Sequence, residues 1–191
     1  TDPKTTVLPL LQASNWPGAA EALALVNTIL VPGIRTEAWK YTRVGKLFNT
    51  NYVSPKGNVE VVLPARLPFD TTRVVFVNGH FRSDLSDDLK ADKGIVIDSL
   101  KNHLQHGPVK AHYGHVAPIG DRLFTAMNTA APTDGLIILA TKGTKTSKPI
   151  HVLHFTVVAE DLPPMLIQPR DLFMLHEGAE VEVIIEHIGT D

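Results

Sequence analysis

The stretch that decides the fold is LIILATKGTKTSKPIHVLHFTVV, residues 136–158. Two apolar runs flank a Lys-rich turn that contains Gly143. Short runs of aliphatic and β-branched residues between Gly- and Pro-containing turns indicate strands. The runs mix continuous apolar residues with alternation, which suits stacked coils of strand whose inner face is buried.

The pattern of short strands continues to the last residue. Segments 165–168, 171–176 and 181–188 are expected to be further strands, separated by turns that contain Pro169 and Gly178. Several short strands with Gly or Pro at the turns are typical of a sandwich, a barrel or a β-solenoid. No numerical repeat distinguishes the solenoid from the other two architectures.

The first two thirds of the chain mix helices with strands. The Ala- and Leu-rich segments 18–30 and 122–131 predict helices, and shorter helices are expected over 43–48 and 100–106, the second capped by Ser99. Strands are expected over 59–63 and 94–98. Asn78-Gly79 predicts a type I′ turn and therefore a β-hairpin near residues 73–82. The fold class is α+β.

Composition excludes several classes of function. The chain has 191 residues, is 43% hydrophobic and 20% charged, and carries a net charge of −2, so no global basic field attracts nucleic acid or a membrane surface. Cys is absent, which excludes disulfides and any Cys-ligated metal site made by this chain alone. We expect a cytoplasmic protein, since neither a signal peptide nor a membrane-spanning stretch is visible. The terminal strand suggests a fragment of a longer protein.

Nine His residues form three pairs with H-x-x-H spacing. His103 and His106 would share a helical face, whereas residues three apart in a strand point to opposite faces. A strand over PIHVLHF, residues 149–155, would therefore separate His151 from His154. The third pair, His112 and His115, flanks Gly114 in an expected loop. We interpret all three pairs as packing or surface residues.

A cupin-like metal site is the alternative reading of a β-rich chain with many His residues. Such sites need several imidazoles and a carboxylate that converge from neighbouring strands. In VEVIIEH, Glu182 and Glu186 are expected on one face of the strand and His187 on the other. Motifs for a Ser or Cys nucleophile and for phosphate-binding loops are absent from the sequence.

The segment RTEAWKYT, residues 35–42, gathers a Trp, a Tyr and several charges into eight positions. Burial of large aromatic side chains accounts for most such clusters, so we expect Trp39 and Tyr41 to serve packing first. The functional alternative is a docking surface. The segment's six candidate residues are Arg35, Glu37, Trp39, Lys40, Tyr41 and Thr42.

This segment resembles the R-x-E-x-W-K-Y-T signature of the SufB/SufD family of iron–sulfur cluster assembly proteins. VVFVNGHFRSDLSD (74–87), FTAMNTAAPTDG (124–135) and PRDLFMLHEGAEVEVIIEHIG (169–189) resemble further family segments, in the same order. The family's Val-Pro is replaced here by Ala140-Thr141. W-K-Y-T and the absence of Cys favour the SufD branch. The shared positions are Asn128, Asp134, Gly135, Pro149, Arg170 and Glu186.

The resemblance implies an N-terminal helical domain, a right-handed parallel β-helix and a C-terminal helical domain. Residues 1–134 would form the helical or mixed domain with its hairpin, and residues 135–191 the opening coils of a truncated β-helix. The implied function is a non-catalytic scaffold that acts with a SufB-like β-helix subunit and a SufC-like ABC ATPase, which binds regions absent here. The iron–sulfur cluster would be transient in the full complex, and no cofactor, metal or catalytic residue is assigned to this chain. The alternatives are the cupin-like enzyme and a β-solenoid binding module.

Overall fold

The computed structural model describes residues 2–12, 14–158 and 162–190, which form two units interleaved along the sequence. The helical unit comprises Thr1–Ser54, Leu104–Pro132 and Leu162–Gln168, and the strand unit comprises Pro55–His103, Thr133–Asp161 and Pro169–Asp191. This division does not follow the expected boundary after residue 134. The hairpin belongs to the strand unit because its first strand pairs with a strand that lies beyond that boundary.

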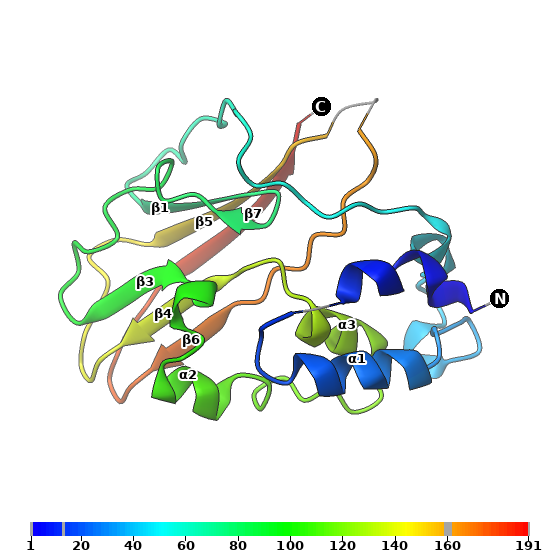
Figure 1. The fold of residues 1–191 in the computed structure, drawn as a ribbon. Coiled ribbons are helices and arrows are strands. Elements are labelled where there is room, and N and C mark those ends of the chain that lie inside the picture. Colours follow the sequence, from blue (N-terminus) through cyan, green and yellow to red (C-terminus); the bar gives the residue numbers. More distant parts are fainter. Residues whose placement is uncertain (1, 13, 159–161, 191) are drawn as a thin grey trace. The chain divides into compact units, whose positions relative to one another are not determined.

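The helical unit is built from short helices (Figure 1). Its longest helix, α1, uses strong helix formers and buries Ala19, Ala22 and Val26 on one face. No helix in the described part of the chain has the length and apolar character needed to cross a membrane. The helices are α1 (Ala19–Thr28), α2 (Gly107–His112) and α3 (Leu123–Ala130), with 3₁₀ turns η1 (Pro3–Thr6), η2 (Leu8–Leu11), η3 (Glu37–Trp39) and η4 (Gly45–Asn49).

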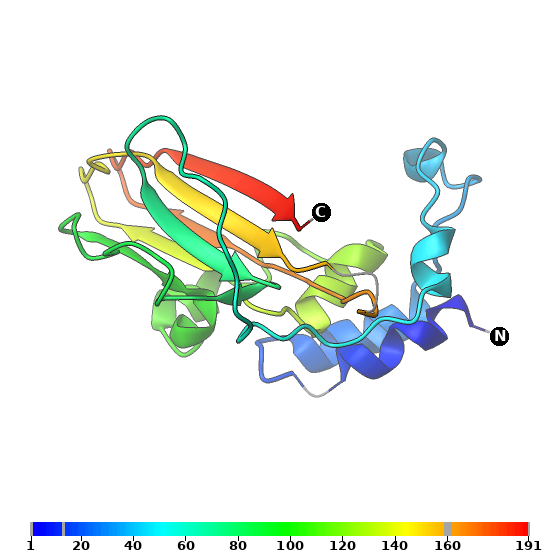
Figure 2. The same ribbon diagram turned by 90° about the horizontal axis from the view of Figure 1, so that it is seen from above.

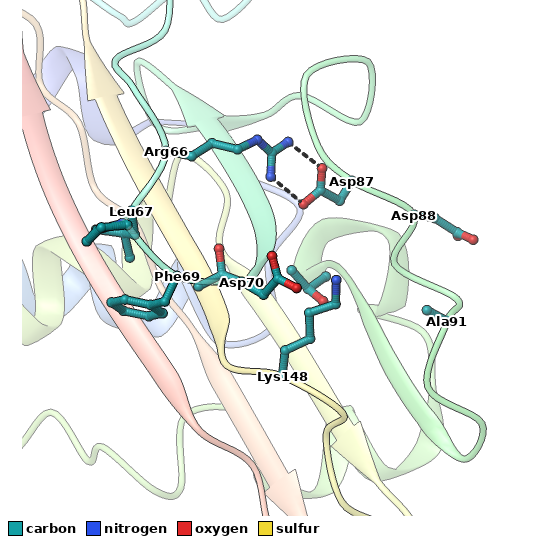
Figure 3. Close-up of a pocket in the computed structure, with 11 residues that line it drawn as sticks. Arg66, Leu67, Phe69, Asp70, Asp87, Asp88, Ala91 and Lys148 are labelled. Atoms are coloured by element: carbon teal, nitrogen blue, oxygen red, sulfur yellow. Dashed lines mark hydrogen bonds and ion pairs between the residues drawn. The ribbon is translucent and has the colours of Figure 1, made fainter.

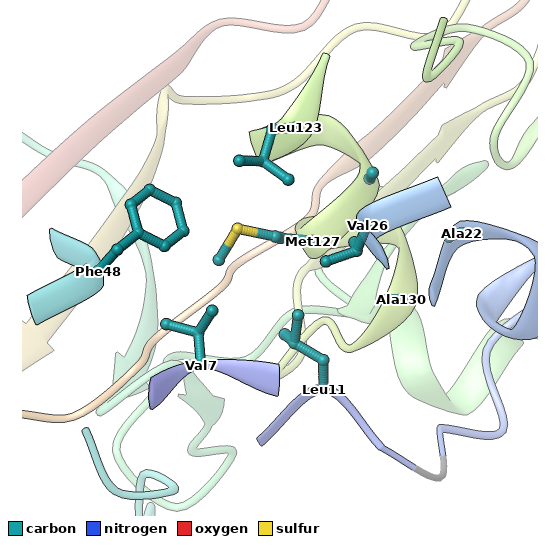
Figure 4. Close-up of a cluster of buried hydrophobic side chains, with 9 residues drawn as sticks. Val7, Leu11, Ala22, Val26, Phe48, Leu123, Met127 and Ala130 are labelled. Carbon is teal, nitrogen blue, oxygen red and sulfur yellow. The ribbon is translucent and has the colours of Figure 1, made fainter. Parts of the chain in front are cut away.

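The core of the helical unit lies between α1, α3 and the 3₁₀ turns (Figure 4). Leu123, Met127 and Ala130 project from one face of α3, as their spacing predicts, and meet Val26 of α1 and Phe48 of η4. Each fully buried aliphatic or aromatic side chain contributes about 1.5–3 kcal/mol relative to an exposed one. Packing therefore holds together elements that are individually too short to be stable.

The C-terminal end of α1 is capped by a buried Lys. Lys4 in η1 is 3% exposed, and its Nζ donates to the carbonyls of Val26, Asn27 and Ile29 at 2.7, 3.1 and 2.9 Å. The last carbonyls of a helix have no partner within the helix, and the negative end of the helix dipole lies there. One ammonium group satisfies three of these acceptors and joins the chain's first turn to α1.

The strand unit contains two sheets (Figures 1 and 2). The first sheet has the order β2-β1-β5-β7, and the second has the order β3-β4-β6. The strands are β1 (Thr72–Val77), β2 (His80–Phe81), β3 (Ile95–Ser99), β4 (Leu136–Ala140), β5 (Ile150–Thr156), β6 (Leu172–Leu175) and β7 (Val183–Gly189), and a 3₁₀ turn η5 (Leu100–His103) follows β3. The expected α+β class is confirmed.

After residue 135 the chain alternates between the two sheets. β4 lies in the second sheet, β5 in the first, β6 in the second and β7 in the first. Each strand pairs in parallel with the one two steps later, since β4 pairs with β6 and β5 with β7. Every second residue points inward, and Val74, Ile138 and Val152 belong to one core between the sheets. Two strands pair in the antiparallel sense: β2 pairs with β1, and β3 pairs with β4.

The hairpin follows the prediction, and the strand expected before it does not form. Asn78 and Gly79 have φ values of 49° and 78°, as a type I′ turn requires. Residues 59–63 are extended without a sheet partner. Arginine side chains bind the carbonyls of this region instead: Arg82 Nη1 donates to Val59 at 2.9 Å, and Arg73 Nη2 donates to Pro64 at 3.1 Å.

Three other expected elements differ from the structure. The helix expected over 100–106 is shortened to the 3₁₀ turn η5, and a separate helix, α2, begins at Gly107, where Pro108 is favoured in the first turn. The helix over 43–48 is the 3₁₀ turn η4. Residues 165–168 form no strand, only an isolated bridge between Met165 and Val53.

We expect Lys4→Met to destabilise the chain by about 2–4 kcal/mol, because it leaves three helix carbonyls without a donor in a buried site. The methionine preserves the apolar stem of the side chain. The midpoint of urea unfolding, with circular dichroism at 222 nm, measures the effect. Lys110→Met is the matched control, since Lys110 is exposed on α2. Equal midpoints for the two variants would contradict the capping role.

Candidate functional site

The shared positions Asp134, Gly135 and Arg170 meet where strands of the second sheet begin. The Asp134 carboxylate is buried and accepts Ser99 Oγ at 2.8 and 2.9 Å and the Gly135 N–H at 2.8 Å. The Arg170 N–H donates to the Asp134 carbonyl at 2.9 Å. Asp134 thus links the end of β3 with the segments that lead into β4 and β6.

Gly135 is required by the close approach of the chain at this point. A Cβ atom on Gly135 would overlap the backbone carbonyl of Arg170. Next to it, the Leu136 N–H donates to Asp171 Oδ1 at 2.7 Å. Burial raises the pKa of Asp171, and the hydrogen bond from Leu136 opposes that rise. The segments Asp134-Gly135 and Pro169-Arg170-Asp171 therefore form two halves of one backbone junction.

The other shared positions lie elsewhere. Asn128 is on α3 in the helical unit. The Pro149 carbonyl accepts the Thr72 N–H at 2.9 Å and thereby starts the β1–β5 ladder. Glu186 lies on β7 with Oε2 2.9 Å from Nε2 of His151.

The first sheet carries polar residues on both faces. His151 is fully buried beside Arg73, its register partner on β1, and pairs with Glu186. His154 points the other way and stacks on Phe76 and on His187, with ring centroids 4.9 and 4.6 Å away. The predicted separation of His151 from His154, and of Glu186 from His187, follows from the two-residue period of a strand.

Burial makes His154 a weak base. Desolvation, with the nearby positive potential of His187, lowers its pKa from 6.5 to about 4. The neutral ring therefore packs as an aromatic side chain at neutral pH. The stack Phe76–His154–His187 crosses β1, β5 and β7 in register.

The signature segment is exposed. Tyr41 is 91% exposed with Lys40 Nζ 5.4 Å from its ring centroid, and the other five candidates are exposed except for the half-buried Trp39. Trp39 packs on Phe124 of α3 with centroids 5.2 Å apart. Burial of Tyr41, as expected from its size, is wrong, and packing accounts for Trp39 alone among the aromatic residues of this segment.

The remaining His pairs show no metal-binding arrangement. Nε2 of His103 lies 3.0 Å from Asp98 Oδ2, and His112 is exposed at the end of α2. Among the residues that the structure describes, no three His, Cys, Asp or Glu side chains are placed to hold a metal ion. The structure thus offers no group of ligands to which a cupin-like metal could be assigned.

A pocket of the strand unit is lined by two cationic and three acidic side chains (Figure 3). Arg66 donates to both carboxylate oxygens of Asp87 at 2.9 and 2.6 Å, and these hydrogen bonds lower the pKa of Asp87. Lys148 and Asp70 also line the pocket, and Asp87 accepts the Arg73 N–H at 2.7 Å. The arrangement orders the segment before β1, and it contains no nucleophile with an adjacent base.

Sequence reasoning missed two residues of the junction. Ser99 was expected to cap a helix, but its hydroxyl binds Asp134, 35 positions away. Asp171 has the same separation from the Leu136 N–H that it accepts. The only available signal was that each residue lies next to a strand boundary.

Asp134→Ala is expected to destabilise the chain by about 2–4 kcal/mol, because the hydroxyl of Ser99 and the N–H of Gly135 lose their buried acceptor. Urea unfolding followed by near-UV circular dichroism measures the loss. Ser99→Ala should cost less, and the double variant should show non-additivity because both changes remove the same hydrogen bonds. Asp88→Ala, at an exposed position, is the control. Strict additivity would refute the direct coupling.

His154 should make stability depend on pH between 6.5 and 4. Its folded pKa is about 4, below the ordinary value of 6.5, so the unfolded chain binds the proton more tightly. The free energy of unfolding therefore falls as the pH falls through this window, by at most about 3 kcal/mol, and the contribution is complete above pH 6.5.

His154→Phe should retain the stack and reduce this slope. Urea midpoints at pH 7 and pH 5 measure the change, with His112→Gln as the control at an exposed position. A slope unchanged by His154→Phe but reduced by His112→Gln would contradict the assignment.

The chain was compared with known proteins. The family model described as SufBD protein N-terminal region matches residues 18–152. An iron–sulfur cluster assembly SufBD family protein of Synechocystis is 30% identical over 172 residues, which cover 87% of this chain and 37% of the relative. The iron–sulfur cluster assembly protein SufD of Escherichia coli is 27% identical over 183 residues, 93% of this chain and 41% of the relative. The chain thus spans less than half the length of these relatives. It belongs to the SufB/SufD family and carries that family's N-terminal region.

Proposed function

We propose that this chain is the N-terminal part of a non-catalytic scaffold subunit for iron–sulfur cluster assembly. It acts in the cytoplasm with a SufB-like β-helix subunit and a SufC-like ABC ATPase. The observation that carries the proposal is the family model, which covers both the signature segment and the strands up to β5. The cluster is the cargo of the whole assembly, and the absence of Cys from this chain supports ligands supplied from elsewhere.

The strand topology supports a right-handed parallel β-helix as the architecture of the complete core. β4, β5, β6 and β7 alternate between two sheets, and each pairs in parallel with the strand two steps later. One such repeat is the pattern of a solenoid coil. β6 and β7 lie at sheet edges, where their backbone groups are available to a following coil. The antiparallel β3 marks the start of the second sheet.

A structural role also agrees with the contacts of the buried polar groups in the strand unit. Asp134 organises a backbone junction, His151 pairs with Glu186, and His154 stacks between aromatic rings. Each of these groups stabilises strand pairing. General acid–base or nucleophilic catalysis requires a group with its reactive atom directed at a substrate site.

Affinity purification of the complete natural gene product from its own cells, followed by native mass spectrometry, tests the proposal. We expect an ABC-type ATPase and a second β-helix subunit to remain bound. Deletion of the gene should lower the activity of enzymes that depend on iron–sulfur clusters, and the complete gene should restore it. A strain that carries the tag alone is the control.

The proposal fails if the complete protein never associates with the ATPase. Normal activity of cluster-dependent enzymes after gene loss would instead favour a β-solenoid binding module without a role in clusters.

A further inference from the structure

The exposed signature segment borders an apolar cleft in the helical unit. The cleft has a volume of 740 Å³ and is lined by Leu30, Pro32, Trp39, Leu123 and Phe124, among others. The Trp39 ring packs on Phe124, which fixes the floor of the cleft. Leu30 is 83% exposed. An exposed Leu beside a concave, mostly apolar surface is an arrangement expected of an interaction site.

The segment that contributes Thr36, Ala38 and Trp39 to the lining of the cleft also carries a cluster of cations. Residues 35–46 contain four basic side chains and one acidic side chain, a local net charge of +3 in a chain whose total is −2. All four cations are exposed, and no ion pair in the described part of the chain involves any of them. Asp121 and Arg122, which line the cleft, cancel each other. The four cations are Arg35, Lys40, Arg43 and Lys46.

Two aromatic contacts tie the cation-bearing segment to α3. Trp39 and Phe48 both contact Phe124, with centroid distances of 5.2 and 6.0 Å. Lys40, Arg43 and Lys46 lie between these two aromatic anchors in the sequence. The segment between Trp39 and Phe48 is therefore fixed at both ends on one residue of α3.

We propose that the apolar cleft at Leu30, Trp39 and Phe124, together with the adjoining basic segment 35–46, is a docking site for an acidic segment of a partner protein. The segment inserts an aliphatic or aromatic side chain into the cleft, and its carboxylates meet the cations. Charge complementarity selects the partner and accelerates association, and the apolar anchor supplies most of the affinity. The inference goes beyond the scaffold function and does not depend on it.

Two other occupants fit the surface less well. Nucleic acid would need several open aromatic faces for stacking, whereas Tyr41 is the exposed ring of this segment and Trp39 packs on Phe124. A membrane favours a protruding apolar face, whereas this surface is concave and belongs to a chain of net negative charge. An acidic segment with one apolar anchor satisfies both the shape and the charge.

The test measures binding of defined probes to the complete natural gene product. The main probe is a fluorescein-labelled peptide of about twelve residues in which Asp and Glu flank a Leu-Phe pair. Three comparison probes are the same peptide with Gly-Ser in place of Leu-Phe, a vesicle of phosphatidylcholine with phosphatidylglycerol, and a labelled single-stranded DNA. Fluorescence anisotropy, at low and high salt, reports peptide and DNA binding, and co-sedimentation reports vesicle binding.

We expect the acidic Leu-Phe peptide to bind best, and more weakly as salt rises. Joint replacement of Arg35, Lys40 and Arg43 by Glu should weaken binding about tenfold or more, and Leu30→Ser should weaken it without changing the salt dependence. These positions are exposed, so the variants should fold. Replacement of Lys93, Lys101 and Lys110 by Glu is the matched control, because it changes the net charge equally at exposed positions away from the signature segment.

Three results would overturn the inference: equal affinity for the Leu-Phe and Gly-Ser peptides, equal losses in the two charge-reversal variants, or preference for the vesicle or the DNA. The outcome is separate from that of the scaffold proposal. A charge-reversal variant that keeps the ATPase but loses the peptide supports the docking site. If the protein does not retain the ATPase but still binds the peptide, only the scaffold proposal is refuted.

Discussion

The hydrogen bonds of Asp134 are the interaction on which the strand unit depends. Its carboxylate accepts from Ser99, at the end of β3, and from the Gly135 N–H, while its carbonyl accepts from Arg170 before β6. One buried residue thus determines where three strands begin or end. An unsatisfied carboxylate would be costly in this position, so the donors and the acceptor must be present together. That mutual requirement explains why two motifs so far apart in the sequence act as one junction.

Beyond this junction, the two-residue period of the strands decides how the polar groups are used. His151 lies on one face of β5 beside Arg73 and Glu186, and His154 lies on the other, stacked with Phe76. These His residues therefore hold neighbouring strands together rather than converging on a metal. Membership of the SufB/SufD family agrees with such a role, since the family-shared positions of the strand unit stabilise its strands. Surfaces for partners have to be sought where side chains remain exposed.

The helical unit shows this distinction at two positions. Lys4 is charged yet buried, because three carbonyls at the end of α1 require a donor. Tyr41 is aromatic yet exposed, because its neighbour Trp39 already covers the available ring of Phe124. From residue type alone, Lys4 would be expected at the surface and Tyr41 in the core. What a side chain does here depends on whether the surrounding backbone has unpaired groups or unoccupied apolar surface.

The sequence by itself determined the α+β class, the Asn78-Gly79 hairpin, the strands β4 and β5 and the opposite faces of His151 and His154. Each of these depends on local signals: turn chemistry, apolar periodicity and the alternation of a strand. Only the tertiary structure decided the pairing of Ser99 with Asp134, the cap by Lys4 and the exposure of Tyr41. The structure also shows no strand over 59–63, where the sequence predicted one. Carbonyls in and next to this segment accept hydrogen bonds from arginine side chains instead. These features depend on partners distant in sequence, and local propensity contains no information about which distant group will satisfy a buried donor or acceptor.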